Sequence, residues 1–423
     1  VYLHIFVAKE VHRMYNTCMD RVILHCDMNG FFASVELLSH PELANVPMAV
    51  CGNPENRHGI ILAKNELAKK AGVVTAQTLW QARKKCPDLQ VVPPHHDKYK
   101  HYSRLINEIY GKFTDMVEPF SIDESWLDVT ASRRLFGDGK YIADTIRKTV
   151  REELGLTLSA GVSFNKIFAK MGSEYKKPDA TTVISRDNYK KILWPMPVSE
   201  MFFVGGATAQ KLNKAGIMTI GQLAQTERAL LENMLGKHGS QLYDYANGLD
   251  DSPVCRQCEK QKIKSVGNGI TFKRNLTGTE DIKTAAMNLA DTVAARLRHY
   301  EMKAHGIKVD IKDTELKTIS RQKQLTVPTN LAYEISEAAV EIIISSWNIR
   351  KPIRMLTITG INLCDEDTEE QISLFGADTV SREKTENLER AMDSIRARYG
   401  QSSITFGKFK TDELGIDPYS DDD

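Results

Sequence analysis

Two short apolar runs that end in acidic residues place the tightest constraint on how this chain folds. "RVILHC" leads into Asp27, and "VEPFSI" leads, much further along the chain, into Asp123 and Glu124. Both runs are typical of β-strands, and the first changes directly into the helical spacing of "GFFASVELL". If the strands over 22–26 and 117–122 are neighbours, three carboxylates meet at one end of a sheet.

These acids have both a structural and a chemical interpretation. Asp27 can cap the helix that follows it, because Asp and Asn are favoured at N-caps, but Asn29 can do so equally well. Asp123 and Glu124 fall at the expected hairpin tip, where Asn-Gly or Asp-Gly is the preferred pair. Clustered carboxylates also bind hard divalent cations such as Mg²⁺, and two such ions support phosphoryl transfer. Spacing alone leaves a cap with a polar turn and a metal site both open.

The chain divides into regions that differ in their pattern of expected strands and helices. Its 423 residues exceed what one hydrophobic core fills, so we expect two to four domains. Strands alternate with helices up to about residue 184, which indicates an α/β or α+β core, and short glycine-broken helices follow. After the polar linker "DSPVCRQCEKQKIKS", the segments from "SVGNGITFKRNL" to "IRMLTITGINL" give the order β-α-β-β-α-β.

Charge is distributed unevenly although the net charge is only +1. Residues 255–330 contain 15 Lys and Arg against 8 Asp and Glu, whereas residues 365–423 contain 7 against 16. A basic segment followed by an acidic tail fits a protein that binds nucleic acid, although solvated charged faces give the same counts.

Cysteines and hydropathy indicate the compartment. The seven cysteines are scattered, which favours reduced thiols in the cytoplasm, and the single CxxC at Cys255 and Cys258 is not expected to bind metal. No apolar run approaches the ~18 residues that span a bilayer, so we expect no membrane association.

Four segments, in this order, carry a resemblance to a known family: "VILHCDMNGFFASVE", "GIILAKNELAKKAGV", "SIDESWLDVT" and "GVSFNKIFAKMGSEYKKP". They resemble the Y-family translesion DNA polymerases of the bacterial DNA polymerase IV branch, and the likeness extends over residues 21–363. It implies an α+β, multidomain right-hand polymerase. The implied parts are an N-terminal extension (1–20), palm (21–31 and 98–184), small fingers (32–97), helical thumb (185–253), linker (254–264), β-α-β-β-α-β little finger (265–364) and acidic tail (365–423).

The resemblance implies a metal-dependent active site in the palm. Asp27, Asp123 and Glu124, with the Met28 backbone carbonyl, would hold two Mg²⁺ ions, with Mn²⁺ as an alternative. Asp27 and Asp123 would bridge the ions, and Glu124 would help to activate the primer 3′-hydroxyl for attack on a deoxynucleoside triphosphate. The implied activity is low-fidelity, template-directed DNA synthesis past damaged bases by a monomer without a proofreading nuclease.

Several residues of this chain match positions that contact the nucleotide. Phe32 matches an aromatic that excludes the ribose 2′-hydroxyl, although an ordinary core Phe has the same spacing, and Phe31 lies beside it. Lys177 matches a lysine that binds the triphosphate, where the alternative is a solvated lysine at a helix end. Many family members have Thr, Tyr and Arg where this chain has Ala63, Glu66 and Lys69. Lys69 can replace Arg only as a point charge, Glu66 would repel phosphate, and Lys64 is a candidate to compensate.

Other residues match DNA-contacting positions. Lys170 is a candidate for the DNA backbone, and Lys273 with Arg274 lie on the basic little finger. "FFVGGATAQKLNKAGI" resembles a helix-hairpin-helix that binds the DNA backbone through the Gly205 amide, but Phe203 stands where a glycine is usual.

The acidic tail contains "QISLF" at 371–375, which resembles a sliding-clamp-binding peptide. Gln371 would be its polar anchor, while Leu374 and Phe375 would fill an apolar pocket. The alternative is that Leu374 packs on the domain at the start of a C-terminal helix such as "TENLERAMDSIRARYG". Two other functions also remain: a nucleotidyl cyclase, which has a palm-like sheet with paired acids, and a clamp-docked DNA-binding protein without catalysis.

Overall fold

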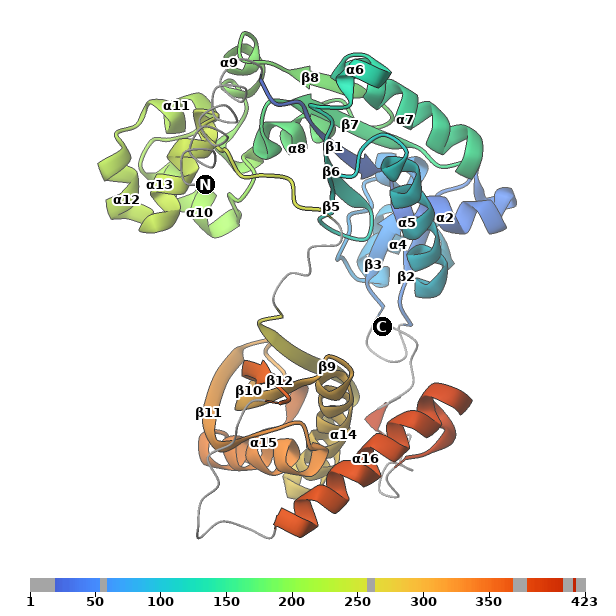
Figure 1. The fold of residues 1–423 in the computed structure, drawn as a ribbon, viewed down its shortest axis with the longest axis vertical. Coiled ribbons are helices and arrows are strands. Elements are labelled where there is room, and N and C mark those ends of the chain that lie inside the picture. Colours follow the sequence, from blue (N-terminus) through green and yellow to red (C-terminus); the bar gives the residue numbers. More distant parts are fainter. Residues whose placement is uncertain (1–19, 54–58, 257–262, 368–378, 406–413, 416–423) are drawn as a thin grey trace, which may run out of the picture. The chain divides into compact units, whose positions relative to one another are not determined.

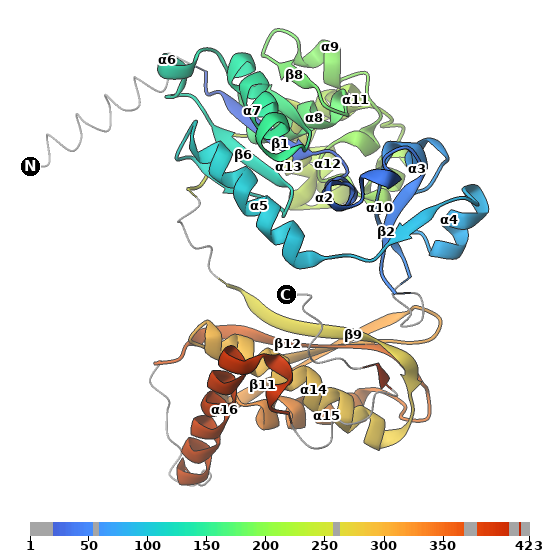
Figure 2. The ribbon, with the colours of Figure 1, turned by 90° about the vertical axis from the view of Figure 1, so that its right-hand side faces the viewer.

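The computed structural model describes residues 20–53, 59–256, 263–367, 379–405 and 414–415. Nearly all of the expected N-terminal extension and the whole QISLF peptide lie outside these ranges. The chain forms two compact units, one made of most residues up to Lys260 and the other containing Gln261–Asp423. Figures 1 and 2 show the helices and strands of each unit. Among the described residues, no helix is both long and apolar enough to cross a bilayer.

A five-stranded sheet in the order β5-β6-β1-β7-β8 forms the centre of the first unit. Its strands are β1 (Ile23–Met28), β5 (Val117–Pro119), β6 (Glu124–Asp128), β7 (Leu158–Ser163) and β8 (Thr181–Ile184). β1 pairs antiparallel with both β6 and β7. The condition considered from the sequence, that the strand over 117–122 neighbours β1, is not met, since β6 lies between β5 and β1. β8 was not expected from the sequence, and it extends the sheet parallel to β7.

The alternation of side chains along β1 divides its residues between the two faces of the sheet. Leu24, Cys26 and Met28 belong to a core that also contains residues of three helices. These helices are α2 (Phe31–Ser39), α5 (His96–Gly111) and α7 (Gly139–Leu154). The alternate residues of β1, His25 and Asp27 among them, must then face the other side of the sheet.

Helix α8 (Lys166–Tyr175) covers that second face, and two glycines allow it to approach closely. A Cβ on Gly161 of β7 would lie 1.8 Å from the Ala169 carbonyl oxygen, and one on Gly172 would lie 3.0 Å from the Gly161 Cα. Ser173 of α8 in turn contacts His25 of β1, with 2.8 Å between Oγ and Nδ1. The end of α8 is thus fixed beside Asp27.

The expected fingers and thumb contain small elements. A three-stranded sheet, β3-β2-β4, is made of β2 (Met48–Cys51), β3 (Ile61–Lys64) and β4 (Gln90–Val92), with helices α3 (Glu66–Lys70) and α4 (Leu79–Lys85). α6 (Arg133–Phe136) lies within the expected palm, and α9 (Tyr189–Leu193) opens the expected thumb. The thumb otherwise consists of α10 (Gly206–Lys214), α11 (Ile220–Gln225), α12 (Arg228–Leu235) and α13 (Lys237–Ala246), which share one apolar core.

The second unit has the expected β-α-β-β-α-β order. Its sheet, β11-β10-β12-β9, is built from β9 (Ser265–Leu276), β10 (Met302–Lys312), β11 (Thr318–Thr329) and β12 (Ile353–Asp365). Helices α14 (Gly278–His299) and α15 (Ala332–Ser346) form a core with the strands. Along β10, buried Ile307, Val309 and Ile311 alternate with partly exposed polar residues, so the sheet has one polar face.

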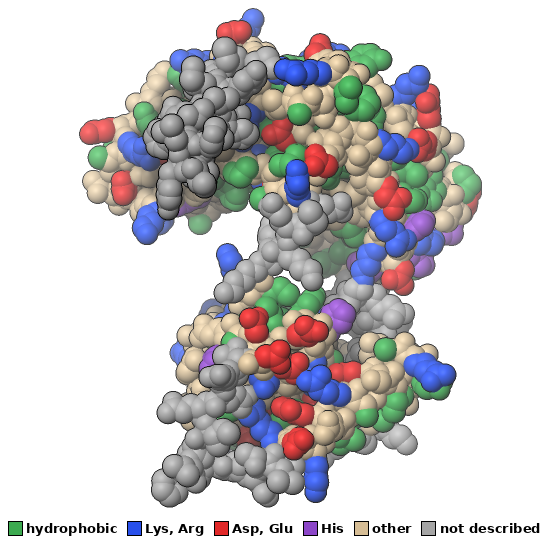
Figure 3. Space-filling view, in the orientation of Figure 1, with side chains coloured by type: hydrophobic (Ala, Val, Ile, Leu, Met, Phe, Trp, Pro, Cys, Tyr) green, Lys and Arg blue, Asp and Glu red, His purple; other side chains and the backbone are tan. Residues whose placement is uncertain are grey.

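The predicted acidic tail contains a long helix, α16 (Thr379–Tyr399), which packs on the second unit through buried ion pairs. Arg298 of α14 pairs with Glu389 and Asp393, and Arg396 of α16 pairs with Asp291 at 2.8 Å. Acidic and basic side chains are visibly intermixed on the face of this unit that Figure 3 shows. A helix over "TENLERAMDSIRARYG" is thus present, whereas Leu374, whose packing was the alternative to clamp binding, lies outside the described residues.

Candidate active site

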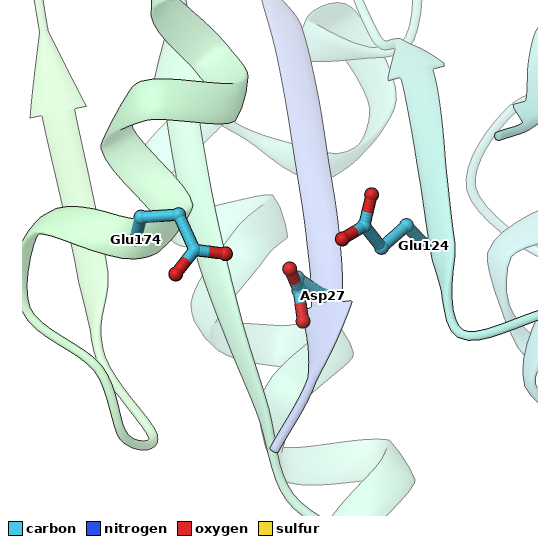
Figure 4. A group of neighbouring side chains, drawn as sticks. All are labelled: Asp27, Glu124 and Glu174. Carbon is cyan, nitrogen blue, oxygen red and sulfur yellow. The ribbon is translucent and has the colours of Figure 1, made fainter. Parts of the chain in front are cut away.

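Three carboxylates from separate elements meet at one end of the five-stranded sheet. Asp27 of β1 stands opposite Glu124, the first residue of β6, in the antiparallel register. Glu174, near the end of α8, completes the group, and one oxygen from each side chain lies within 4.8 Å of the others. Figure 4 shows the three carboxylates facing a common space. The structure thus brings Asp27 and Glu124, two acids singled out in the sequence, together at one end of the sheet.

Two lysines neutralise part of this negative charge. The Nζ of Lys177 lies 2.8 Å from Asp27 Oδ1 and 2.7 Å from Glu174 Oε1. Lys170 Nζ lies 2.6 Å from Glu124 Oε2. Arg147 holds the loop after Lys177 by its contact with Asp179, with 2.7 Å between the guanidinium and Oδ1. The lysine expected to bind triphosphate and the lysine expected to bind DNA therefore both lie at the carboxylate cluster.

Burial sets the electrostatic character of Asp27. Its side chain is only 4% exposed, and Oδ2 is buried with no hydrogen-bond partner among the described residues. Desolvation raises the pKa of Asp27 to about 9, although the charge of Lys177 opposes the shift. Burial acts on Glu124 in the same sense, but hydrogen bonds to His25 and Lys170 outweigh it, and its pKa is lowered.

This arrangement suits a divalent cation. A buried carboxylate oxygen without a donor is costly, whereas oxygen ligands clustered around a cation are the normal environment of Mg²⁺. Two further carboxylates lie within reach of the same space. The residues present therefore fit the metal that the sequence predicts, and a cation there would favour the ionised form of Asp27 and so oppose the effect of burial on its pKa.

Asp123 occupies the turn before β6, and its side chain lies outside this three-acid group. Its Oδ1 accepts a hydrogen bond of 2.6 Å from Ser121, and its carbonyl accepts one of 3.1 Å from the Met28 amide. Asp123 is therefore tied by its backbone to the residue after Asp27. Its side chain is partly exposed.

Phe32 follows the site directly because Gly30, with a φ of 54°, makes a tight turn from β1 into α2. Its ring stacks on Tyr99 of α5 at 4.0 Å and is partly exposed, whereas Phe31 is buried in the core. The Tyr99 hydroxyl donates a 2.6 Å hydrogen bond to Glu36, which is fully buried and also lies 2.9 Å from His95 Nδ1. The ring of Phe32 is thus held by a buried polar network.

The residues that depart from the family pattern lie on β3 and α3. Lys69 Nζ lies 3.5 Å from Glu66 Oε1, and both side chains are about half exposed. Lys64 donates a 3.0 Å hydrogen bond to Thr75, and partial burial together with the charge of Lys69 lowers its pKa. Three charged side chains therefore project from one short segment, and two of them are cations.

The expected DNA contacts lie in both units. Gly205 caps α10 without a side-chain hydrogen bond, and a Cβ on Gly205 or Gly206 would meet nothing within 4 Å. In the second unit, Lys273 is exposed on β9, while Arg274 is paired with Asp281 at 2.5 Å. Gln371, Leu374 and Phe375 lie outside the described residues.

Sequence reasoning missed Glu174 and the network behind Phe32. Glu174 lies in "GSEYKKP", a segment noted only for its lysine, and nothing in the sequence shows that the helix end meets β1. Tyr99 and Glu36 stand in two different helices, so their pairing required the fold. The sequence shows Glu36 only as an acidic residue between Val35 and Leu37, and its burial appears in the structure alone.

Comparison with known proteins agrees with this geometry. Residues 26–174 match the impB/mucB/samB family, residues 263–374 its C-terminal domain, and residues 203–250 the thumb domain described for DNA polymerase-iota. The IMS family helix-hairpin-helix motif matches residues 186–217.

Whole-chain relatives extend this match. The chain is 46% identical to DNA polymerase IV of Acetivibrio thermocellus, over 92% of this chain and 97% of that protein. It is 40% identical to DNA polymerase IV of Clostridium kluyveri, with 92% and 98% covered. A Y-family DNA polymerase chimera of Dbh and Dpo4 has a similar fold, with a TM-score of 0.72 at 24% identity, covering 81% of this chain and 99% of that one. The chain therefore belongs to the Y family of translesion DNA polymerases.

Proposed function

We propose that this chain extends DNA primers past damaged template bases by nucleotidyl transfer at the Asp27 site, with low fidelity and without proofreading. The observation that carries this proposal is the meeting of Asp27, Glu124 and Glu174 around a buried, unpartnered carboxylate oxygen. Family membership supplies the DNA and deoxynucleotide substrates. It also makes a nucleotidyl cyclase or a non-catalytic DNA-binding protein the weaker interpretation.

Asp27, Asp123, Glu124 and the Met28 carbonyl would hold two Mg²⁺ ions. Such ions, when bound, stabilise the attacking and leaving oxygens of an in-line transfer. Glu124 remains ionised at neutral pH because its pKa is lowered, so it can orient the primer 3′-hydroxyl. Lys177 can leave its ion pairs for the triphosphate and neutralise the charge that develops on pyrophosphate.

Phe32 and the small fingers would set substrate selection. A ring fixed by Tyr99 at the start of α2 is suited to exclude a 2′-hydroxyl by contact. The three-stranded fingers sheet offers little surface to enclose a nascent base pair, which would permit damaged bases and lower fidelity. We place this reaction in the cytoplasm, performed by a monomer, on the basis of cysteine usage and composition.

A primer-extension assay tests this proposal. The purified chain, Mg²⁺ and each deoxynucleotide in turn are incubated with a labelled primer on undamaged and abasic templates. We expect extension on both templates, some misincorporation, and no primer shortening when nucleotides are omitted. Failure to extend the undamaged template would reject nucleotidyl transfer, and primer shortening would reject the absence of proofreading.

We also propose that the QISLF peptide binds a sliding clamp. Support comes from the sequence, since Gln371, Leu374 and Phe375 have the spacing of such peptides. The elements on either side, β12 and α16, belong to the same compact unit, so a bound clamp would be tethered close to it. Alanine at these three positions should shorten products made with a clamp and leave clamp-free synthesis unchanged. If the parent chain and the alanine variant made products of equal length in the presence of the clamp, clamp binding through this peptide would be contradicted.

A further inference from the structure

The turn that precedes α10 contains an aromatic residue in a conformation that favours glycine. The Val204 amide donates a 2.9 Å hydrogen bond to the Met201 carbonyl, which closes a four-residue turn. Phe203 is the third residue of this turn and has a φ of 71°. A positive φ at this place is the type II pattern, in which glycine is preferred because it has no Cβ.

Contacts on one side hold Phe203 in this conformation. His238 of α13 has its Nε2 3.2 Å from the Phe203 carbonyl oxygen. The ring centroid lies 4.0 Å from that of Phe202 and 5.7 Å from that of Tyr245, on which it stacks. The side chain is nevertheless 49% exposed, so burial of the ring does not account for its presence at a strained position. Strained residues of this kind are concentrated where they contact ligands.

The exposed ring lies beside groups that suit a DNA backbone. Gly205, two residues later, and Gly206 are exposed at the start of α10, where the first amides of a helix have no intrahelical acceptor and suit a phosphate. The neighbouring Phe202 ring is 5.9 Å from the Phe120 ring. The Nζ of Lys170 lies 5.2 Å from the Phe202 ring and 5.1 Å from the Phe120 ring. An exposed aromatic ring, packed on one side against other aromatic rings, therefore lies beside the exposed start of a helix.

We propose that the Phe203 ring packs against a deoxyribose of the DNA strand whose phosphate binds at Gly205 and Gly206. A DNA backbone alternates anionic phosphates with sugars that present C–H groups, and the hairpin alternates donors with an aromatic face in the same way. The aromatic side chain thereby adds apolar contact area at a hairpin that would otherwise offer only its backbone. This inference rests on the thumb binding the DNA backbone, as the family resemblance implies.

Two substitutions distinguish the effect of the Phe203 ring from the effect of its strained backbone conformation. Phe203→Ala removes the ring and retains the Cβ, whereas Phe203→Gly removes the ring and also relieves the strain. Both should raise the dissociation constant for a primer–template duplex about five- to tenfold, as loss of one well-placed aromatic contact does. Phe203→Gly should unfold at a higher temperature than Phe203→Ala. Fluorescence anisotropy and thermal unfolding measure these two effects.

Leu230 of α12 provides the matched control, because it is also 49% exposed and lies in the same helical region. Leu230→Ala should bind DNA like the parent chain. Gly205→Ala tests the underlying backbone contact, since its methyl group has room in the protein but would obstruct a phosphate.

Each outcome decides one point. If Gly205→Ala weakens binding and Phe203→Ala does not, the ring contact is rejected and the thumb contact stands. If neither change weakens binding, the thumb contact itself is rejected. If only Phe203→Gly weakens binding, the effect comes from backbone freedom, and the proposed ring contact is rejected.

Discussion

The Nζ of Lys177 lies 2.8 Å from Oδ1 of Asp27, so the most buried acid of the cluster is paired with the cation of the loop after α8. Glu174 holds the same lysine at 2.7 Å. Asp27 is also a proposed metal ligand, and Glu174 lies close enough to Asp27 and Glu124 to be one. The structure therefore raises the question of whether Glu174 binds metal or positions Lys177.

We predict that Glu174 positions the lysine. Its side chain is half exposed and already hydrogen-bonded, unlike the unpartnered oxygen of Asp27. Glu174→Gln should keep kcat within about threefold and raise the KM for deoxynucleotide modestly, because only the orientation of Lys177 changes. Lys177→Ala should lower kcat/KM about a hundredfold, as expected when a charge that stabilises the leaving group is lost. Single-nucleotide kinetics measure both, and a loss of Mg²⁺ affinity in Glu174→Gln would show instead that it is a ligand.

Asp123 should be essential despite its position outside the three-acid group. Asp123→Ala should lower primer extension by about a thousandfold or more, since a metal ligand acts on the transition state. Binding of primer–template DNA should be unchanged. Ser121→Ala is the matched control because it removes only the hydrogen bond to Asp123, and it should extend primers normally. Retained extension by Asp123→Ala would refute the assignment.

Phe32 should control sugar selection, and Tyr99 should support it. Phe32→Ala should increase the use of ribonucleotides about a hundredfold relative to deoxynucleotides, because the contact that excludes the 2′-hydroxyl is gone. Tyr99→Phe keeps the stacked ring and loses the hydroxyl, which donates to Glu36 and accepts from the His95 amide, so it should retain selection. Competition between the two nucleotide types in a primer-extension assay gives the ratio. An unchanged ratio for Phe32→Ala would show that Phe32 does not exclude the ribose 2′-hydroxyl.

The sequence predicted the parts of this site that depend on local pattern. Asp27 follows the apolar run over 22–26, and Glu124 lies at the predicted hairpin tip after the run over 117–122. Their place at a sheet end could therefore be inferred. The strand order could not, because an antiparallel hairpin can place either of its strands next to β1. Glu174 escaped prediction for a different reason, since its position depends on how closely α8 approaches β7 through Gly161 and Gly172.

The second unit shows the same limit. Its β-α-β-β-α-β order followed from alternation and helical spacing, and the structure has it. The sequence offered a C-terminal helix only as an alternative to the clamp-binding peptide, and it did not identify the partners of the charged residues of α16. Three residues of that helix, Glu389, Asp393 and Arg396, are paired with Arg298 and Asp291 of α14. The composition of a segment does not show which of its charged residues form ion pairs.

The close approach of α8 to β7 should make Gly161 indispensable for folding. Its Cβ would lie 1.8 Å from a backbone carbonyl, so Gly161→Ala must displace the helix that carries Glu174. We expect a loss of about 3 kcal/mol or more in the free energy of unfolding. Gly111→Ala, at the end of α5, meets nothing within 4 Å and should be neutral or stabilise by about 0.5 kcal/mol. Urea unfolding compares the two, and equal stabilities would contradict the close packing.

Arg298 should be the main attachment of α16 to the second unit. Its side chain and that of Glu389 are each only 4% exposed, so Arg298→Met leaves a buried carboxylate without its cation. Removal of one partner from a buried pair costs about 3 kcal/mol, whereas an exposed pair contributes less than about 1 kcal/mol. Lys283→Met breaks the exposed pair with Glu280 in the same helix and is the control. Limited proteolysis should cleave α16 rapidly in Arg298→Met and at the parental rate in Lys283→Met. Equal rates would mean that apolar contacts, such as that of buried Met392, hold the helix without the ion pairs.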